Sequence, residues 1–178
     1  MRPCLKAAVD ALAKSGPESP FRLVSDISQL LPHVREKFLQ WRDALAADGI
    51  NVRVVETFRS YTRQKYLYER AGGATKAPPG CSWHQLRRAW DAYPLRKDGT
   101  IAMHYAGEDA KLFDAMGRKA EALGIEWGGR WRSIKDYGHF QVTDGLTIDQ
   151  AAELDLTVAP VIAASAAEKE GRKDEEVS

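Results

Sequence analysis

The chain has 178 residues and a mass of 19.8 kDa, which is enough for one domain with its own core and short for two. Hydrophobic residues make up 44% and charged residues 29%, so collagen-like, coiled-coil and fully disordered classes are excluded. Lys and Arg number 26 against 25 Asp and Glu, and this net charge of +1 gives no reason to expect nucleic-acid binding. No apolar run approaches the ~20 residues of a membrane-spanning helix, so we expect no stable membrane insertion.

The first predicted unit is an N-terminal extension, residues 1–24, with a short helix over 5–12. That apolar stretch is short and contains Lys6 and Asp10, which argues against a secretory signal and for cytoplasmic synthesis. The two cysteines, Cys4 and Cys81, are expected to be reduced thiols, because a chain of this length can build a core without a disulfide.

Hydrophobic periodicity then predicts a long helix over 25–49, beginning either at Ser25 or at Pro32. Residues 51–58 are β-branched and partly alternating, which predicts a strand. The remaining expected elements are helices over 62–71, 109–123 and 147–154 and strands over 88–95, 125–127 and 139–143.

This order of elements predicts an α+β fold, a small single domain over 25–155 in which helices flank a central antiparallel sheet. Residues 156–178 have many charges and few apolar side chains after Ala163, so we expect a disordered tail.

Two of the four histidines have an aspartate close by in the sequence. Asp91 follows His84 by seven residues, and Asp136 precedes His139 by three. A catalytic zinc uses three nitrogen or oxygen ligands and leaves a fourth position for water, whose pKa it lowers. His84, Asp91 and His139 are suitable ligands for one zinc ion per chain. Spacing alone leaves open that the aspartates are turn or cap residues and that the histidines pack by chance.

A zinc hydrolase also needs a base and an oxyanion donor that are not themselves ligands. Asp136 is the candidate base, and Arg59, at the end of the strand predicted over 51–58, is the candidate donor. Other groupings are weaker: the Cys81-x-x-His84 pair lacks the second pair that a structural zinc requires, and no Gly-x-Ser-x-Gly elbow is present.

Three separated motifs resemble the LAS-type zinc peptidases. This family includes D-alanyl-D-alanine carboxypeptidases and dipeptidases, and the L-alanyl-D-glutamate endopeptidases of phage endolysins and of Bacillus cell-wall lysis. The motifs are Thr57-Phe-Arg59 running on to Tyr68, Ser82-x-His84-x6-Asp91, and the string 124–141, which ends in Asp136-Tyr-Gly-His139-Phe-Gln. The similarity covers roughly residues 30 to 143 and is greatest to the L-alanyl-D-glutamate branch.

The resemblance implies the fold shared by these peptidases and hedgehog proteins, with Zn2+ held by His84, Asp91 and His139. It further implies that Asp136 is the general base, that Arg59 steadies the scissile carbonyl, and that Ser82 and Gln64 touch substrate.

Three positions depart from the family pattern: Arg87 and Gly138 stand where glycine and proline are usual, and Arg130 stands where aspartate is usual. If residue 87 requires a positive φ, an arginine there costs about 1–2 kcal/mol and threatens the position of Asp91.

We therefore expect a monomeric zinc endopeptidase that cuts the L-alanyl-D-glutamate bond of the peptidoglycan stem peptide. Such a protein fits a phage or prophage endolysin that reaches the cell wall through a phage-made membrane lesion. Two alternatives stay open: D-alanyl-D-alanine carboxypeptidase activity with the same machinery, and a non-catalytic member that binds zinc or wall peptide.

Overall fold

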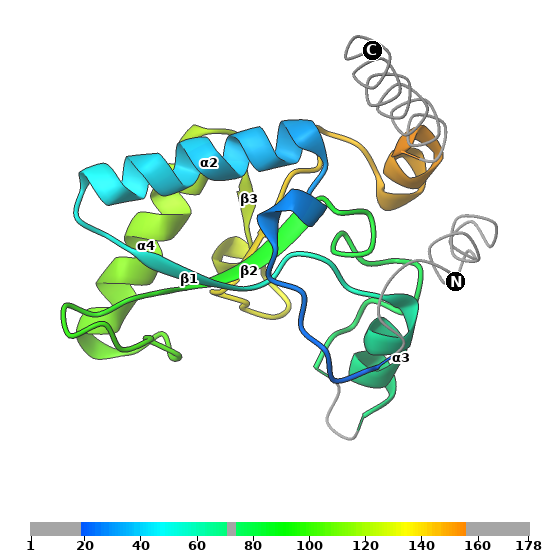
Figure 1. Cartoon of the computed structure of the whole chain (residues 1–178), viewed down its shortest axis with the longest axis horizontal. Coiled ribbons are helices and arrows are strands. Elements are labelled where there is room, and N and C mark those ends of the chain that lie inside the picture. The colour runs from blue at the N-terminus through cyan, green and yellow to red at the C-terminus, as the bar shows by residue number, and fades with distance from the viewer. Residues whose placement is uncertain (1–18, 71–73, 156–178) are drawn as a thin grey trace, which may run out of the picture.

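A computed structural model describes residues 19–70 and 74–155 of the chain (Figure 1). The helix expected over 5–12 and the tail expected over 156–178 lie outside these residues. The elements, in chain order, are η1 (Ile27–Gln29), α2 (Pro32–Ala47), β1 (Val52–Glu56), α3 (Tyr61–Glu69), β2 (Ala89–Pro94), α4 (Gly107–Ala122), β3 (Glu126–Trp127), η2 (Gly128–Arg130) and β4 (His139–Gln141). Residues 148–155 form a further helix.

The four strands form one sheet in the order β1-β2-β4-β3, and every neighbouring pair is antiparallel. The predicted α+β class with a central antiparallel sheet is therefore confirmed. Helices α2 and α4 pack against each other on one side of the sheet, whereas α3 lies apart from both (Figure 1).

The helix ends follow local chemistry. The first long helix starts at Pro32 rather than Ser25, because proline lacks the N–H that the first turn leaves unpaired in any case. Ser60 caps α3 by accepting a hydrogen bond from the Arg63 N–H. Thr147 caps the helix over 148–155 by accepting a hydrogen bond from the Gln150 N–H.

The sheet has one core face and one polar face because side chains alternate along each strand. Trp90 and Ala92 of β2 and Phe140 of β4 point into the core, where they meet aromatic side chains of α2. The indole of Trp41 donates to the Met116 carbonyl at 3.0 Å and so ties α2 to α4. The intervening residues of β2 and β4 consequently face the opposite side, where the site lies.

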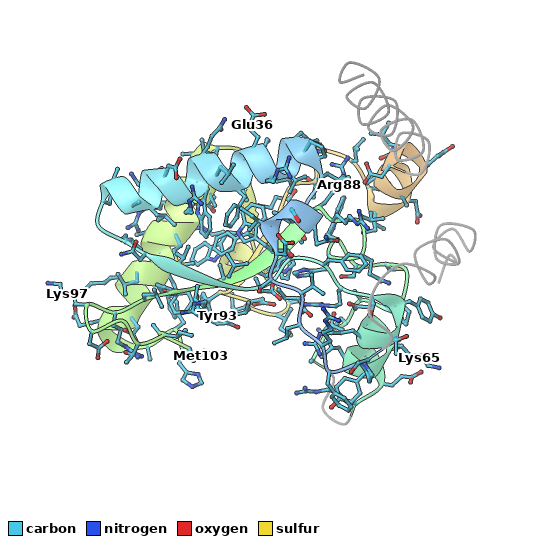
Figure 2. The ribbon with its side chains drawn as sticks, in the orientation of Figure 1. Glu36, Lys65, Arg88, Tyr93, Lys97 and Met103 are labelled. Atoms are coloured by element: carbon cyan, nitrogen blue, oxygen red, sulfur yellow. The ribbon has the colours of Figure 1, made fainter. Side chains whose placement is uncertain are left out.

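Two terminal segments pack onto this unit. The Pro20 carbonyl accepts a hydrogen bond from Arg63, and Val24 forms a β-bridge with Phe58, so residues 19–24 contact the domain that we expected to begin at residue 25. At the other end, the buried Arg88 binds Asp155 and Asp144, beside the helix over 148–155 (Figure 2). No helix in the described ranges has the length and apolar character needed to cross a membrane.

Candidate active site

Three side chains that are distant in the sequence converge in one cleft. Asp91 and His139 are cross-strand partners on β2 and β4, so their side chains emerge side by side on the polar face of the sheet. His84 comes from the turn that precedes β2, where the Gln85 N–H binds the Ser82 carbonyl. The cleft has a volume of about 650 Å³ and also contains Arg59, Ser82 and Asp136 in its walls.

The three candidate ligand atoms form a nearly equilateral triangle. His84 Nε2 lies 3.2 Å from Asp91 Oδ1 and 3.2 Å from His139 Nδ1, and His139 Nδ1 lies 3.1 Å from Asp91 Oδ1. A tetrahedral ion with bonds of about 2.0–2.1 Å holds its ligand atoms about 3.3 Å apart. Two imidazoles and one carboxylate are also the donor types that zinc uses, so these residues fit the ion.

The electrostatics of the triangle lower the pKa values of Asp91 and His84 but raise that of His139. Burial alone would raise the pKa of Asp91, yet the charges and hydrogen bonds of the two histidines hold it well below its usual range. Burial and the nearby Arg59 charge lower the pKa of His84. Burial also opposes the charge on His139, but its hydrogen bond to Asp91 raises the pKa of that ring.

Arg59 lies next to the triangle and is held by three acceptors. It donates to Glu56 at 2.9 Å, to Asp91 Oδ2 at 3.1 Å and to Gln64 Oε1 at 3.2 Å. Glu56 is buried and also binds Arg63, so the carboxylate lies between two guanidinium groups. Because its nitrogens are held from several sides, the guanidinium has a fixed position in the cleft.

A bulge in β1 places Glu56 beside the site. The register pairs Val54 with Ala92 and then skips one residue, so that Glu56 rather than Val55 faces Asp91. An extra residue of this kind redirects a side chain that would otherwise point to the other face. Glu56, Asp91 and His139 thereby form one row across β1, β2 and β4.

Asp136 lines the same cleft from the loop before β4. Burial in the cleft, followed by the charge of Asp91, raises the pKa of Asp136 above the usual carboxyl value. The loop is shaped by Gly128, whose carbonyl accepts from the Asp136 N–H, and a Cβ on Gly128 would come within 2.5 Å of the Asp136 carbonyl oxygen.

The two residues expected to touch substrate are placed differently. Ser82 is buried and lies in the wall of the cleft. Gln64 is fully buried outside the cleft wall, where it accepts from Arg59 and donates to the Ala77 carbonyl at 2.7 Å. The geometry of Gln64 is that of a support for Arg59.

Arg87 does adopt a positive φ, of 59°. Its guanidinium lies over the Phe58 ring, 5.2 Å from the ring centroid, and its carbonyl accepts from the Leu31 N–H. Asp91 nevertheless remains in the ligand triangle, so the strain at residue 87 does not displace it.

The other two departures have local explanations. Arg130 points away from the cleft, to an ion pair with Glu121 and a stacking contact with Trp127. Gly138 packs against Tyr93, whose ring would lie 2.9 Å from any added Cβ.

The prediction of a reduced thiol at Cys81 is wrong, because this residue is disulfide-bonded in the structure. A count of two cysteines determines neither their separation nor their redox state. Cys4 lies outside the described residues.

Sequence reasoning did not assign roles to Glu56, Arg63, Glu126 or Gln141, all of which support the site. The available signal was spacing: Gln141 follows His139 by two in a strand and so shares its face, and Glu56 precedes Arg59 by three. The spacing of Glu56 and Arg59 places both at the site only because of the bulge in β1, and no pattern in the sequence indicates that bulge.

Comparisons with known proteins identify relatives of this chain. A family model described as D-alanyl-D-alanine carboxypeptidase matches residues 75–142. The peptidoglycan L-alanyl-D-glutamate endopeptidase CwlK of Bacillus subtilis (strain 168) is 36% identical over 126 residues, which are 65% of this chain and 74% of that protein. The L-alanyl-D-glutamate peptidase of Listeria phage A118 is 29% identical over 124 residues, 67% of this chain but only 40% of the phage protein.

Solved structures show the same fold. The L-Ala D-Glu endopeptidase ChiX of Serratia marcescens superposes with a TM-score of 0.52 at 24% identity, over 70% of this chain and 89% of that one. The LD-carboxypeptidase LdcB gives a TM-score of 0.51 at 18% identity, over 70% of this chain and 68% of that one. From the similarity to the Bacillus enzyme, the matching family model and the shared fold, we conclude that the chain belongs to the LAS-type zinc peptidases.

Proposed function

We propose that this protein is a zinc-dependent peptidoglycan hydrolase that cleaves the L-alanyl-D-glutamate bond of the stem peptide. The observation that carries the proposal is the triangle of His84, Asp91 and His139, which shares a cleft with Arg59 and Asp136. The two relatives named L-alanyl-D-glutamate peptidases support this choice of bond.

His84, Asp91 and His139 would hold the zinc ion. When bound, zinc supplies Lewis-acid polarisation of the reacting oxygens. Asp136 removes a proton from the attacking water as general base while the water oxygen bonds to the carbonyl carbon. Arg59 donates hydrogen bonds to the carbonyl oxygen as negative charge develops on it. The peptide C–N bond then breaks, and Asp136 delivers the proton to the departing D-glutamate amine.

Ser82 is assigned to substrate contact from the wall of the cleft, and Gln64 to the positioning of Arg59. Tethering by Glu56, Gln64 and Asp91 means that little reorganisation of the Arg59 guanidinium is needed during the reaction.

We further propose that the protein acts as a monomer and as a phage or prophage lysin released through a membrane lesion. The similarity to the Listeria phage enzyme supports the lysin role.

D-alanyl-D-alanine carboxypeptidase activity is the second candidate, because the description of the matching family model favours it. The test is incubation of the full chain with peptidoglycan, with and without a chelator, followed by mass spectrometry of the released peptides. New N-terminal D-glutamate or D-isoglutamine supports the endopeptidase, and free D-alanine supports the carboxypeptidase. Absence of products with zinc-loaded protein contradicts both and favours a binding role.

A further inference from the structure

His139 is bound at both of its ring nitrogens. Its Nδ1 belongs to the ligand triangle, and its Nε2 lies 3.0 Å from Gln141 Oε1. A neutral imidazole has one protonated nitrogen and one lone-pair nitrogen, and the partner at one nitrogen decides which is which. His139 can therefore offer Nδ1 to a metal only if Nε2 carries the proton, which requires an acceptor at Gln141.

The Gln141 amide presents an acceptor at one end and a donor at the other, so its orientation has to be set by something else. The Gln141 Nε2 lies 2.8 Å from Glu126 Oε2. A carboxylate can only accept, so it draws the NH2 end of the amide towards itself and leaves Oε1 facing His139. The Thr143 hydroxyl binds the other oxygen of the same carboxylate, Oε1.

The sheet holds these groups in register. Glu126 and Gln141 are direct cross-strand partners on β3 and β4, and Gln141 shares a strand face with His139 two residues earlier. Gln141 is buried, whereas Glu126 is exposed at the edge of the sheet. A chain of hydrogen bonds therefore runs from a surface carboxylate, through a buried amide, to a ring of the ligand triangle.

We propose that Gln141 is a positioning residue of the metal centre and that Glu126 sets its orientation, so that His139 is held in the tautomer that presents Nδ1. This inference rests on the proposed function, since it requires that the triangle binds zinc. Neither side chain touches the reacting atoms, and their effect passes through His139.

The test is the zinc dissociation constant of the full chain, measured by competition with a chromogenic chelator. Loss of a partner that orients a metal-binding histidine typically costs 10–100-fold in metal affinity. We expect Gln141→Leu to weaken zinc binding by about that factor, and Glu126→Gln by roughly 10-fold, because an amide at 126 no longer dictates the orientation of the amide at 141. Thr143→Val is the matched control: it removes a bond to the same carboxylate on the side away from Gln141 and should leave the constant within about 2-fold.

A double variant separates orientation from simple packing. Combining Glu126→Gln with Gln141→Glu places the carboxylate beside His139, where it accepts from Nε2–H, and the amide at the edge, where it donates to that carboxylate. Net charge and volume are almost unchanged. We expect the double variant to bind zinc within about 3-fold of the wild type and more tightly than Glu126→Gln alone.

The outcomes distinguish the two proposals. Failure of the wild-type protein to bind zinc overturns the proposed function itself. Wild-type binding together with unchanged affinity in both Gln141→Leu and Glu126→Gln overturns the positioning role. If Gln141→Leu does not fold, Glu126→Gln and the double variant decide, because residue 126 is exposed; a double variant that binds no better than Glu126→Gln counts against the proposal.

Discussion

Glu56 and Asp91 face each other across β1 and β2, and both accept hydrogen bonds from the guanidinium of Arg59. One carboxylate belongs to the ligand triangle and the other does not. Arg59 therefore links the metal ligands to a buried anion that is also bound by Arg63. The position of the proposed oxyanion donor depends on this pairing, and the pairing depends on the bulge in β1.

We predict that Glu56→Gln destabilises the protein by about 3 kcal/mol, because it removes the charge that compensates two largely buried guanidinium groups. The turnover number should also fall, because Arg59 loses an anchor. The measurement is urea unfolding followed by tryptophan fluorescence. Glu121→Gln is the control, since its ion pair with Arg130 is exposed and should contribute less than about 1 kcal/mol. Equal stability losses in the two variants would contradict the argument.

Asp136→Ala should retain zinc binding but lose turnover by about 10²–10⁴-fold, the usual contribution of a general base. Asp136 lines the cleft but is not one of the three triangle residues, so the metal content should not change. Zinc content by atomic absorption and the rate of peptide release test the two statements separately. Retained activity in this variant would remove the assignment of the base.

The strain at Arg87 can be isolated by comparing two truncations. Arg87→Gly and Arg87→Ala both lose the contact with Phe58, but only glycine accepts a φ of 59° without cost. We expect Arg87→Gly to be more stable than Arg87→Ala by about 1 kcal/mol in urea unfolding. Zinc affinity should be the same in both, because Asp91 already lies in the triangle in the presence of the strain. The reverse order of stability would show that residue 87 is unstrained.

The ion pair between Asp144 and the buried Arg88 predicts a specific pH dependence of the protein's stability. Burial alone would raise the pKa of Asp144. The hydrogen bond from Arg88 and the charge of Lys37 outweigh burial and lower this pKa below its usual value. The folded state then binds the Asp144 proton more weakly than the unfolded state, so this stabilisation is complete above the unfolded pKa of about 3.9 and is lost as the pH falls below it.

The test is the urea midpoint of the wild type and of Asp144→Asn at pH 6 and pH 3. Asparagine tolerates the positive φ of 51° at this position, so the comparison isolates the charge. The wild type should lose more stability between the two pH values than the variant. Parallel losses would mean that Asp144 does not contribute.

How far the sequence predicts this site depends on the kind of residue. His84, Asp91 and His139 were predicted because few side chains can bind zinc, and the structure brings them together. The two faces of β2 and β4 follow from alternation, which the sequence also shows. Glu56 was not predicted, because its place depends on an extra residue in β1 that only strand pairing reveals.

The sequence also does not predict the role of a residue when that role depends on which neighbour its side chain turns towards. Gln64 has the residue type of a substrate contact, but it lies buried behind Arg59. Arg130 differs from the family pattern, yet it turns to Glu121 and leaves the cleft unaffected. In each case the residue type is compatible with several neighbours, and tertiary packing selects one of them.

The row of Glu56, Asp91 and His139 has a consequence for how the molecule matures. Its members come from three strands separated by 35 and 48 positions in the chain, so no fragment that lacks β1, β2 or β4 can assemble the row. Two of its members, Asp91 and His139, also belong to the ligand triangle, so capture of an ion would report that β2 and β4 have paired. Ion uptake during refolding should accordingly follow this pairing, and catalytic competence should not appear before it.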